Sequence, residues 1–405
     1  MLKLFNSLGK RLETFHPANR GTVYIFTCGP SVYQRAHMGN FRTFLFEDVL
    51  VRYLKYSGYH VRRGMNFTDI EDKALTTAHE SKVSLERLTS RHIRTFMDEM
   101  RALKMERPDY LPRASKHVRD AIKIVEALLE KGIAYRFGNN IYFDPLKVPG
   151  FGKIYGLDMG KWPSRKVRFH LDNYPTTRWN LGDFVLWHGC RREERVCWDA
   201  EVGTGWPAWN VQDPSMIVSF VHEPLSIFCG GIDNLVGHHD YNAAILESIR
   251  PYPAAKFWLH CHHLMIKGQT MSKSAGNVLY IGSLRDQGYA MEAIRFFLIY
   301  GHYRSQINYS KRRMRHMAER LGTLRGRIAQ IRKAARGKPD AGNRTALRIR
   351  KIFRDHMNAD LNVTEAFDGV ERMLLETVPE TLQPSAASAI LDAVRSVDSV
   401  LQILL

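Results

Sequence analysis

Hydrophobic and polar residues follow two different rhythms near the start of the chain. Residues 23–26 form a short apolar run, which is typical of a buried strand. Residues 41–61 place apolar side chains at helical spacing, and this pattern stops at Gly58. A second short strand is expected within residues 61–69. Because strand, helix and strand in this order form a βαβ unit, the sequence predicts a parallel sheet.

The pattern changes several times further along the chain. Charge-rich helices are expected over 74–107, and a strongly periodic helix is expected within 111–135, ending at Gly132. Residues 136–200 hold many Gly, Pro, Trp and other aromatic residues with little helical periodicity, so they are interpreted as a β-rich insertion. Segments 225–233, 254–266 and 290–300 restore α/β character. After Gly301 the pattern is helical to the end, with a loop over 336–343.

Composition narrows the cellular setting. The chain has 405 residues, of which 44% are hydrophobic, as in an ordinary globular protein. It has no apolar run of 18 or more residues, so no transmembrane helix is expected. Lys3, Asn6, Ser7 and Lys10 interrupt the first apolar residues, which argues against a signal peptide. We therefore expect a cytoplasmic protein that does not associate with membranes.

The cysteines are few and scattered. Their odd number, wide spacing and lack of a secretory signal argue against a disulfide framework, so reduced thiols or metal ligands are expected. No pair has the close spacing of a cysteine-only zinc site. The five are Cys28, Cys190, Cys197, Cys229 and Cys261.

Net charge suggests a class of partner. The formal charge is +18 and the isoelectric point is near 9.7, a surplus that favours polyanions such as nucleic acid over other partners. Solubility alone is the other explanation. Residues 311–354 are densely basic, and their acidic residues are only Glu319 and Asp340. A basic helical surface of this kind suits contact with a phosphate backbone.

Two short motifs suggest phosphate chemistry. The stretch "TCGPSVYQRAHMGN", residues 27–40, joins the first strand to the first helix. Gly39 would let a nucleotide approach the backbone closely, and the helix N-terminus offers N–H donors to phosphate. The second motif, "TMSKSAGN" at residues 270–277, has Lys273 between two serines and could fold over a triphosphate. Either motif alone is weak, since a lone His or Lys is usually structural or exposed.

In this order, the motifs make the chain resemble the class I aminoacyl-tRNA synthetases, and specifically the cysteinyl-tRNA synthetase family. Further matching stretches are "NFTDIEDKAL", "GGID…GHH" and "GHYRSQINYS". The resemblance runs from about residue 20 to the end of the chain. It implies that an amino acid attacks the α-phosphate of ATP, giving an aminoacyl-adenylate and pyrophosphate, and that the acyl group then passes to an acceptor.

The resemblance also implies a fold and a domain order. We expect an α/β protein with a Rossmann-type parallel-sheet catalytic domain, a β-rich insertion and a C-terminal helical bundle. The expected parts are the first half of the catalytic domain at 1–135, the connective insertion at 136–205, the second half of the catalytic domain with its lysine loop at 206–305, and the helical domain at 306–405.

Site residues follow from the family motifs. The catalytic residues implied are His37, Asn40 and Lys273, with ATP and Mg²⁺ as cofactors. Thr68 matches a position near the amino acid, although a helix N-cap would equally suit it. The implied ATP-binding set is His37, Gly39, Asn40, Gly230, Gly231, Asp233, Met271 and Lys273. The implied amino-acid-binding set is Cys28, Gly29, Thr68, Trp209, Asp213 and Phe228.

The chain departs from the family at the metal site. Cysteinyl-tRNA synthetases hold zinc with two Cys, a His and a Glu, and Cys28 and His238 match two of these ligands. Asp213 stands where the second Cys is expected, and Asn242 replaces the Glu. Two alternatives remain open: zinc held by Cys28, Asp213 and His238, or no metal and Asp213 facing a cationic or hydroxylated side chain.

Two further positions differ. Phe228 stands where the family has a His just before its glycine-rich stretch. This apolar residue adds to the signs of a remodelled amino-acid pocket. The run "HCHH", residues 260–263, is interpreted mainly as packing on a strand, with a metal role as the alternative.

Three functions are compatible with the sequence. The first is a cysteine–tRNA ligase-like enzyme with tRNA as acceptor and a possibly altered amino-acid specificity. The second is a ligase that joins the activated amino acid to a small amine or carrier, as in the mycothiol cysteine ligases. The third is a non-catalytic RNA-binding paralogue. We expect that the family's usual small anticodon-reading domain does not follow the helical part, which weakens the tRNA hypothesis, whereas the basic residues 311–354 favour RNA.

Overall fold

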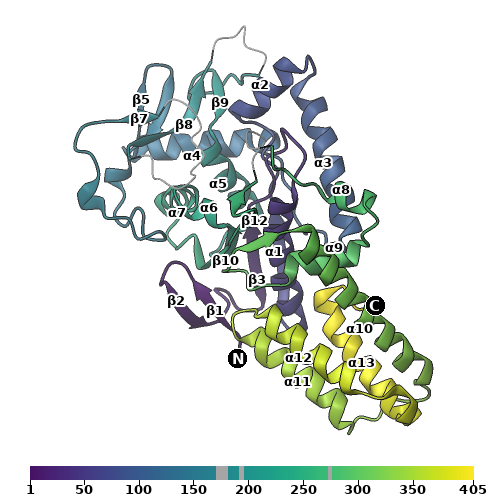
Figure 1. Ribbon diagram of the computed structural model, residues 1–405. Coiled ribbons are helices and arrows are strands. Elements are labelled where there is room, and N and C mark those ends of the chain that lie inside the picture. The colour runs from purple at the N-terminus through teal and green to yellow at the C-terminus, as the bar shows by residue number, and fades with distance from the viewer. Residues whose placement is uncertain (170–180, 191–195, 272–275) are drawn as a thin grey trace.

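The computed structural model describes residues 1–169, 181–190, 196–271 and 276–405. Its centre is a four-stranded parallel sheet in the order β11-β10-β3-β4, with the helix α1 across it (Figure 1). These elements confirm the predicted βαβ unit and the Rossmann-type α/β fold. Their bounds are β3 Thr22–Thr27, α1 Met38–Tyr56, β4 His60–Met65, β10 Leu225–Gly231 and β11 Ala255–Cys261.

Helix α1 is defined at both ends by local interactions. His37 is its N-cap and forms a capping box with Asn40, which satisfies backbone donors that the first turn leaves free. Gly58, just beyond the helix, has a φ of +89° that other residues rarely adopt. The buried positions of α1 lie on several faces and include Arg42, Glu47 and Asp48, so this helix is enclosed by the rest of the fold.

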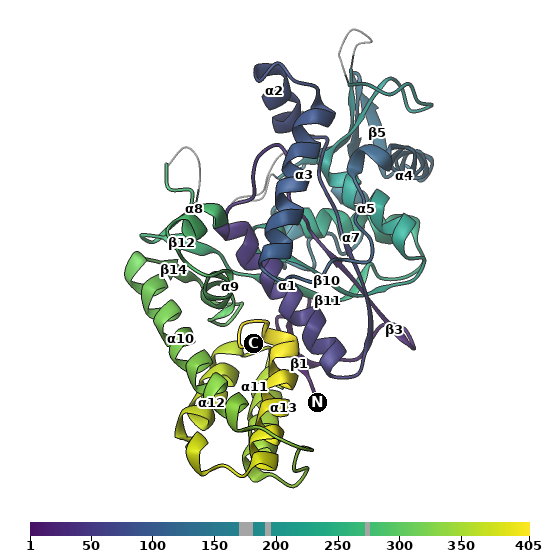
Figure 2. The ribbon, with the colours of Figure 1, turned by 90° about the vertical axis from the view of Figure 1, so that its right-hand side faces the viewer.

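The middle of the chain builds a helical arm and a second sheet (Figure 2). The helices α2 Asp72–Glu80, α3 Leu85–Ala102 and α4 Val118–Glu130 occupy the regions predicted to be helical. The second sheet has the order β5-β6-β8-β7, with β9 paired to β8. It confirms a β-rich region for the described part of 136–200. Its strands are β5 Ala134–Phe137, β6 Asn140–Phe143, β7 Arg168–Phe169, β8 Asp183–Gly189 and β9 Gly205–Pro207.

The second half of the α/β part returns the chain to the central sheet. Between β9 and β11 lie α5 Trp209–Phe220, α6 Ile232–Leu235 and α7 His238–Ile249. A three-stranded sheet of β12 Leu264–Ile266, β13 Gln269–Thr270 and β14 Ile307–Tyr309 follows. Two helices, α8 Ile281–Asp286 and α9 Met291–Ile299, lie between β13 and β14 in the chain.

The C-terminal part is a bundle of helices. It consists of α10 Lys311–Ala334, α11 Arg344–Asn358, α12 Val363–Glu376 and α13 Pro384–Leu401. The predicted loop lies between α10 and α11. One hydrophobic core runs from the central sheet into this bundle and includes Ile25, Leu298, Phe353 and Val397. The N-terminal hairpin of β1 Lys3–Asn6 and β2 Arg11–Thr14 also packs against this core through Leu4.

The expectation of reduced cysteines is wrong for one pair. Cys190 and Cys197 are joined by a disulfide. The backbone is paired on both sides of this disulfide. Cys190 N donates to Thr204 O, and Trp198 pairs with Gly205. This pairing brings the two cysteines together. The other three thiols are free and buried, at Cys28, Cys229 and Cys261.

No helix in the described part of the chain is both long enough and apolar enough to cross a membrane.

Candidate active site

The candidate site lies where two parallel strands end side by side. Cys28 follows β3, and Gly230 and Gly231 close β10. The two strands are neighbours, and Cys28 N donates to Cys229 O at 3.1 Å. The chain continues outward from β3 to β4 and, on the other side, from β10 to β11. Open parallel sheets bind ligands at such a reversal, beyond the carboxyl ends of the strands.

His37 and Asn40 hold each other at the start of α1. His37 Nδ1 accepts from Asn40 N at 3.3 Å, and Asn40 Oδ1 accepts from His37 N at 3.0 Å. Burial lowers the pKa of His37 to about 4, so the ring is neutral near pH 7. Because Nδ1 accepts, the proton of the neutral ring resides on Nε2. His37 can therefore donate one N–H to an oxyanion at the helix N-terminus.

Close packing explains two glycines of the motifs. A Cβ on Gly39 would lie 3.0 Å from the His37 ring and 3.6 Å from Met271 Cε. A Cβ on Gly231 would lie 2.4 Å from Asp233 Oδ1. Met271 therefore lies against the first turn of α1, as expected for a residue of the lysine loop.

The other end of the lysine loop also reaches α1. Met38 N donates to Leu279 O at 2.8 Å, so Met271 within the 270–277 motif and Leu279 just after it both lie at the N-terminus of α1. Asp233 is exposed in the first turn of α6. Lys273, the predicted catalytic lysine, lies outside the described residues.

A buried polar cluster lies beside this nucleotide site. Asp213 Oδ2 lies 3.4 Å from Cys28 Sγ and 2.9 Å from His238 Nε2. Cys28 follows β3, Asp213 lies on α5 and His238 opens α7, so three elements converge. The three ligand atoms all lie within 4.8 Å of one another, and all three residues are buried. The structure thus brings together the three residues proposed as metal ligands.

The donor atoms of this cluster suit zinc. Thiolate, carboxylate and imidazole are all zinc ligands, and three of them leave an open fourth position. Burial, followed by the charge of Asp213, raises the pKa of Cys28 well above its ordinary value. Without a cation the thiol is therefore protonated and donates to Asp213, and a bound metal would displace this proton.

Asn242 lies next to the cluster on the second turn of α7. Its Nδ2 is 3.1 Å from His238 Nε2, and its Oδ1 has no hydrogen-bond partner in the described part of the chain. An amide oxygen is a weaker zinc ligand than the carboxylate expected from the family. The cluster therefore offers three good donors.

Two histidines that the sequence analysis did not assign to the site form a chain of hydrogen bonds that ends at Cys28. His239 Nε2 is 3.2 Å from Cys28 Sγ, and His239 Nδ1 is 2.8 Å from His260 Nε2. His260 Nδ1 in turn lies 2.8 Å from Ser7 Oγ. Burial lowers the pKa of His239 well below its ordinary value and that of His260 to about 3. Both rings are therefore neutral and form a buried chain of hydrogen bonds behind Cys28.

This chain clarifies the "HCHH" run. His260 is a buried hydrogen-bonding residue, which agrees with a packing role, and the metal-capable group found among the described residues does not include it. In the sequence, only its position next to His238 indicated that His239 could lie near the site. The contact with Cys28 could not be foreseen, because residues 28 and 239 are distant in the sequence.

Asn66 is a further residue that the implied site sets did not include. Asn66 Oδ1 accepts from Gly29 N at 2.7 Å, and Asn66 Nδ2 donates to Asp213 Oδ1 at 2.8 Å. Its Nδ2 also lies 3.3 Å from Thr68 Oγ1. The alternative that Thr68 caps a helix is wrong, because α2 begins at Asp72 with Glu71 as its N-cap.

Aromatic rings enclose the cluster. The Trp209 ring stacks on His238 with centroids 4.1 Å apart. Phe228 is fully buried and packs against Trp258 at 4.8 Å and His239 at 4.7 Å. Trp209 therefore covers His238, whereas Phe228 makes an apolar contact with His239 of the hydrogen-bonded histidine chain.

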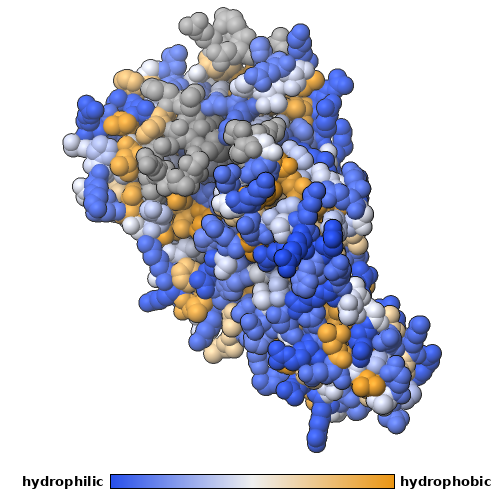
Figure 3. Space-filling view, in the orientation of Figure 1, coloured by the Kyte–Doolittle hydropathy of each residue, from blue (hydrophilic) through white to orange (hydrophobic). Residues whose placement is uncertain are grey.

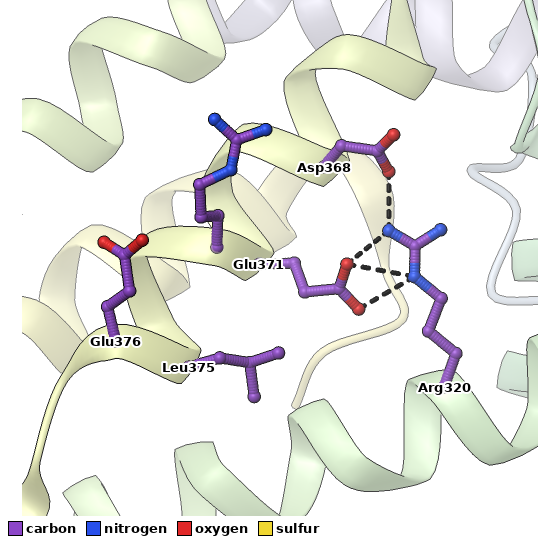
Figure 4. A pocket seen from close by; sticks show the side chains of 6 residues that line it. Arg320, Asp368, Glu371, Leu375 and Glu376 are labelled. Carbon is purple, nitrogen blue, oxygen red and sulfur yellow. Dashed lines mark hydrogen bonds and ion pairs between the residues drawn. The ribbon is translucent and has the colours of Figure 1, made fainter.

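A separate cavity in the helical part is not connected with this chemistry. It measures about 530 Å³ and is open to solvent, between α10 and α12 (Figure 4). Arg320 in this cavity is paired with Asp368 and Glu371. Its charged groups largely satisfy one another.

Comparisons with known proteins identify the family to which the chain is similar. Residues 14–319 match the family model for the catalytic domain of class I (C) tRNA synthetases. The chain is 32% identical to a cysteine–tRNA ligase from Chlamydia muridarum, over 100% of this chain and 88% of the relative. It is 34% identical to a cysteine–tRNA ligase from Thermococcus onnurineus, over 91% and 78%.

Solved structures share the fold. A methionyl-tRNA synthetase from Mycobacterium tuberculosis, in complex with methionyl-adenylate, superposes with a TM-score of 0.68 at 16% identity, covering 95% of this chain and 91% of the other. A putative arginyl-tRNA synthetase from Campylobacter jejuni gives 0.62 at 12% identity, covering 96% and 94%. With these relatives, the chain belongs to the cysteinyl-tRNA synthetase family of class I ligases.

Proposed function

We propose that the protein activates an amino acid with ATP and transfers it to tRNA, the reaction of its family. The observation that carries this proposal is that the α1 N-terminus, the end of β10 and the buried Cys28 cluster meet at the carboxyl ends of the central strands. A carboxylate oxygen of the amino acid would attack the α-phosphorus while the bond to pyrophosphate breaks. Catalysis of this kind relies on positioning and charge stabilisation.

Each motif has a role in this proposal. The Nε2–H of His37 and the N-terminus of α1 would donate to phosphate oxygens, with Asn40 fixing the orientation of the ring. Asp233 would accept from the ribose hydroxyls. Lys273 would stabilise charge on the departing pyrophosphate, and Mg²⁺ would accompany ATP. Gly39, Gly230, Gly231 and Met271 would provide close backbone and side-chain contacts to the nucleotide.

The amino acid would lie beside the buried cluster. Gly29, Thr68 and Trp209 would contact it, and zinc held by Cys28, Asp213 and His238 would offer it an open position. The metal would supply a Lewis-acidic contact to the amino-acid side chain. An oxygen ligand in place of a thiolate makes such a centre harder and less partial to sulfur. We therefore expect weaker preference for cysteine over serine than a site with two thiolates would give.

The experiment combines metal analysis with pyrophosphate exchange. Metal content is measured on purified protein, and ATP–pyrophosphate exchange is measured for each of the twenty amino acids, with and without tRNA. The proposal predicts exchange with at least one amino acid, about one zinc per chain, and modest discrimination between cysteine and serine. The variant Asp213→Cys should raise that discrimination. Absence of exchange with every amino acid would overturn the assigned activity, and a preference for cysteine of many thousandfold in the unmodified protein would overturn the altered pocket.

The helical part at 306–405 would carry the RNA contact. Lys311, Arg312 and Arg315 project from the first turns of α10, are exposed, and form no ion pair in the described part of the chain. Figure 3 shows hydrophilic side chains over much of this part of the molecule. Such unpaired cations suit the phosphate backbone of tRNA.

A further inference from the structure

We infer that Asn66 is a positioning residue that fixes Asp213 and Gly29 in the amino-acid pocket. The inference rests on the proposed amino-acid pocket and assigns a role to Asn66, which begins the matching stretch "NFTDIEDKAL" but was in none of the implied site sets. Asn66 lies one residue beyond β4 and is 2% exposed. Its amide group reaches two other elements of the site.

The two ends of the Asn66 amide have different tasks. The oxygen accepts from Gly29 N at 2.7 Å, and the nitrogen donates to Asp213 Oδ1 at 2.8 Å. Asp213 Oδ1 is thereby committed to Asn66. The other oxygen, Oδ2, is the atom that lies near both Cys28 Sγ and His238 Nε2. Asn66 therefore determines which carboxylate oxygen faces the ligand cluster.

The backbone contact makes this arrangement rigid. A Cβ on Gly29 would lie 1.8 Å from the carbonyl oxygen of Asn66, so the segments after β3 and β4 approach as closely as glycine allows. Val32 N also donates to Thr68 O at 3.0 Å. The amide of Asn66 is thus held by its own backbone, and it can orient Asp213 without moving.

Such a residue matters more for an Asp than for a Cys at position 213. A carboxylate has two oxygens and can rotate about its terminal bond, which is broad in its preferences. A hydrogen bond to one oxygen removes this freedom. Hydrogen bonds to the groups that ligate a metal typically change metal affinity by about 10- to 100-fold.

The experiment separates the two ends of the amide. Asn66→Asp keeps the acceptor for Gly29 N but places a carboxylate against Asp213, whereas Asn66→Ala removes both functions. The matched control is Asn210→Ala, because Asn210 is also 2% exposed, lies on the helix that carries Asp213, and its Oδ1 has no hydrogen-bond partner in the described part of the chain. Each protein is titrated with Co²⁺ alone, and the thiolate-to-cobalt absorption is recorded.

We expect both Asn66 variants to bind Co²⁺ at least about 10-fold more weakly than the control, with an altered absorption spectrum. In pyrophosphate exchange, both Asn66 variants should have a higher KM for the preferred amino acid. The kcat of the Asn210→Ala control should remain unchanged. The double variant Asn66→Asp with Asp213→Asn exchanges donor and acceptor, so it should recover the thermal stability lost in Asn66→Asp without recovering Co²⁺ binding.

The outcomes separate this inference from the proposed metal. If the unmodified protein binds no Co²⁺ but the Asn66 variants still raise the KM for the amino acid, the metal assignment fails and the role of Asn66 stands. If Co²⁺ affinity, spectrum and KM in the Asn66 variants equal those of Asn210→Ala, Asn66 does not position Asp213 and the inference is wrong.

Discussion

The hydroxyl of Tyr303 donates to the carboxylate of Asp360 at 2.6 Å, across the boundary between the α/β part and the helical bundle. Asp360 follows α11, whereas Tyr303 belongs to the segment that leads into β14. The same carboxylate accepts from Phe5 N at 2.8 Å and from Arg304 Nε at 2.7 Å. One buried side chain thus connects the N-terminal hairpin, the segment before β14 and the bundle.

Replacing Asp360 by Asn should destabilise the protein. The NH₂ group of the new Asn side chain would be a donor facing the O–H and N–H donors that now bond to the Asp360 carboxylate. We therefore expect a loss of about 2 kcal/mol or more in the free energy of unfolding. Asp360 has a φ of 61°, which Asn tolerates, so backbone strain adds little. Chemical denaturation measures the change. The control Asp355→Asn removes an exposed carboxylate paired with Lys351 and should leave the free energy of unfolding nearly unchanged, because solvent screens such a pair. Equal effects of the two substitutions would contradict this role of Asp360.

Replacing His37 by Asn should separate catalysis from folding. Asn is a good N-cap, so α1 should keep its start and the free energy of unfolding should change by less than about 1 kcal/mol. The Nε2–H donor to phosphate is lost, and pyrophosphate exchange should fall by about 100-fold. The exposed His16 provides the control variant His16→Asn. Normal exchange in His37→Asn would contradict the assigned phosphate contact.

Lys273 tests the lysine loop in the same assay. Lys273→Ala should lower adenylate formation by about 100-fold or more if the ammonium group stabilises the departing pyrophosphate. Lys256→Ala removes an exposed lysine elsewhere on the α/β part and should leave exchange unchanged. A Lys273 variant with unmodified exchange rates for every amino acid would remove this residue from the mechanism.

The basic start of α10 should govern the salt dependence of RNA binding. Replacing Lys311, Arg312 and Arg315 by Gln removes three phosphate-seeking charges. The slope of log affinity for tRNA against log salt should then become shallower by about 2 to 3. The control variant replaces three exposed cations in the α4 region, Lys116, Arg119 and Lys123. If the control changes the slope as much, or if no RNA binds at low ionic strength, the α10 surface is not the RNA contact.

Buried neutral histidines should make the protein sensitive to acid. Burial lowers the pKa of His260 from 6.5 to about 3. At pH 5 the His260 ring is therefore protonated in the unfolded chain and neutral in the folded protein. The stability tied to His260 is therefore present above pH 6.5 and is lost as pH falls toward 3. Between pH 7 and pH 5 this group alone should cost about 2 kcal/mol in the free energy of unfolding.

Chemical denaturation at several pH values checks this expectation. His260→Gln should make the pH dependence shallower by that amount, whereas the exposed His60→Gln should leave it unchanged. Identical pH profiles for the His260 variant and the unmodified protein would show that His260 is not kept neutral by burial.

The sequence by itself determined the local elements and the nucleotide motifs. The apolar run at 23–26 and the helical spacing after it were sufficient to predict β3, α1 and β4, because strand and helix periodicities depend on residues only a few positions apart. His37 and Asn40 form their capping box within one helical turn. The family resemblance then identified Cys28, Asp213 and His238 as a possible ligand set before any distance was known.

Only the tertiary structure decided how these residues meet. The contacts of Asn66 with Asp213, of His239 with Cys28, and of His260 with Ser7 join positions that are 147, 211 and 253 residues apart. No local pattern encodes such pairs, since each depends on the order of β3, β4, β10 and β11 in the sheet. The Cys190–Cys197 disulfide, which residue spacing argued against, likewise depends on how β8 pairs with β9. Sequence periodicity determines which face of an element is buried, whereas the packing of whole elements determines which buried polar groups become partners.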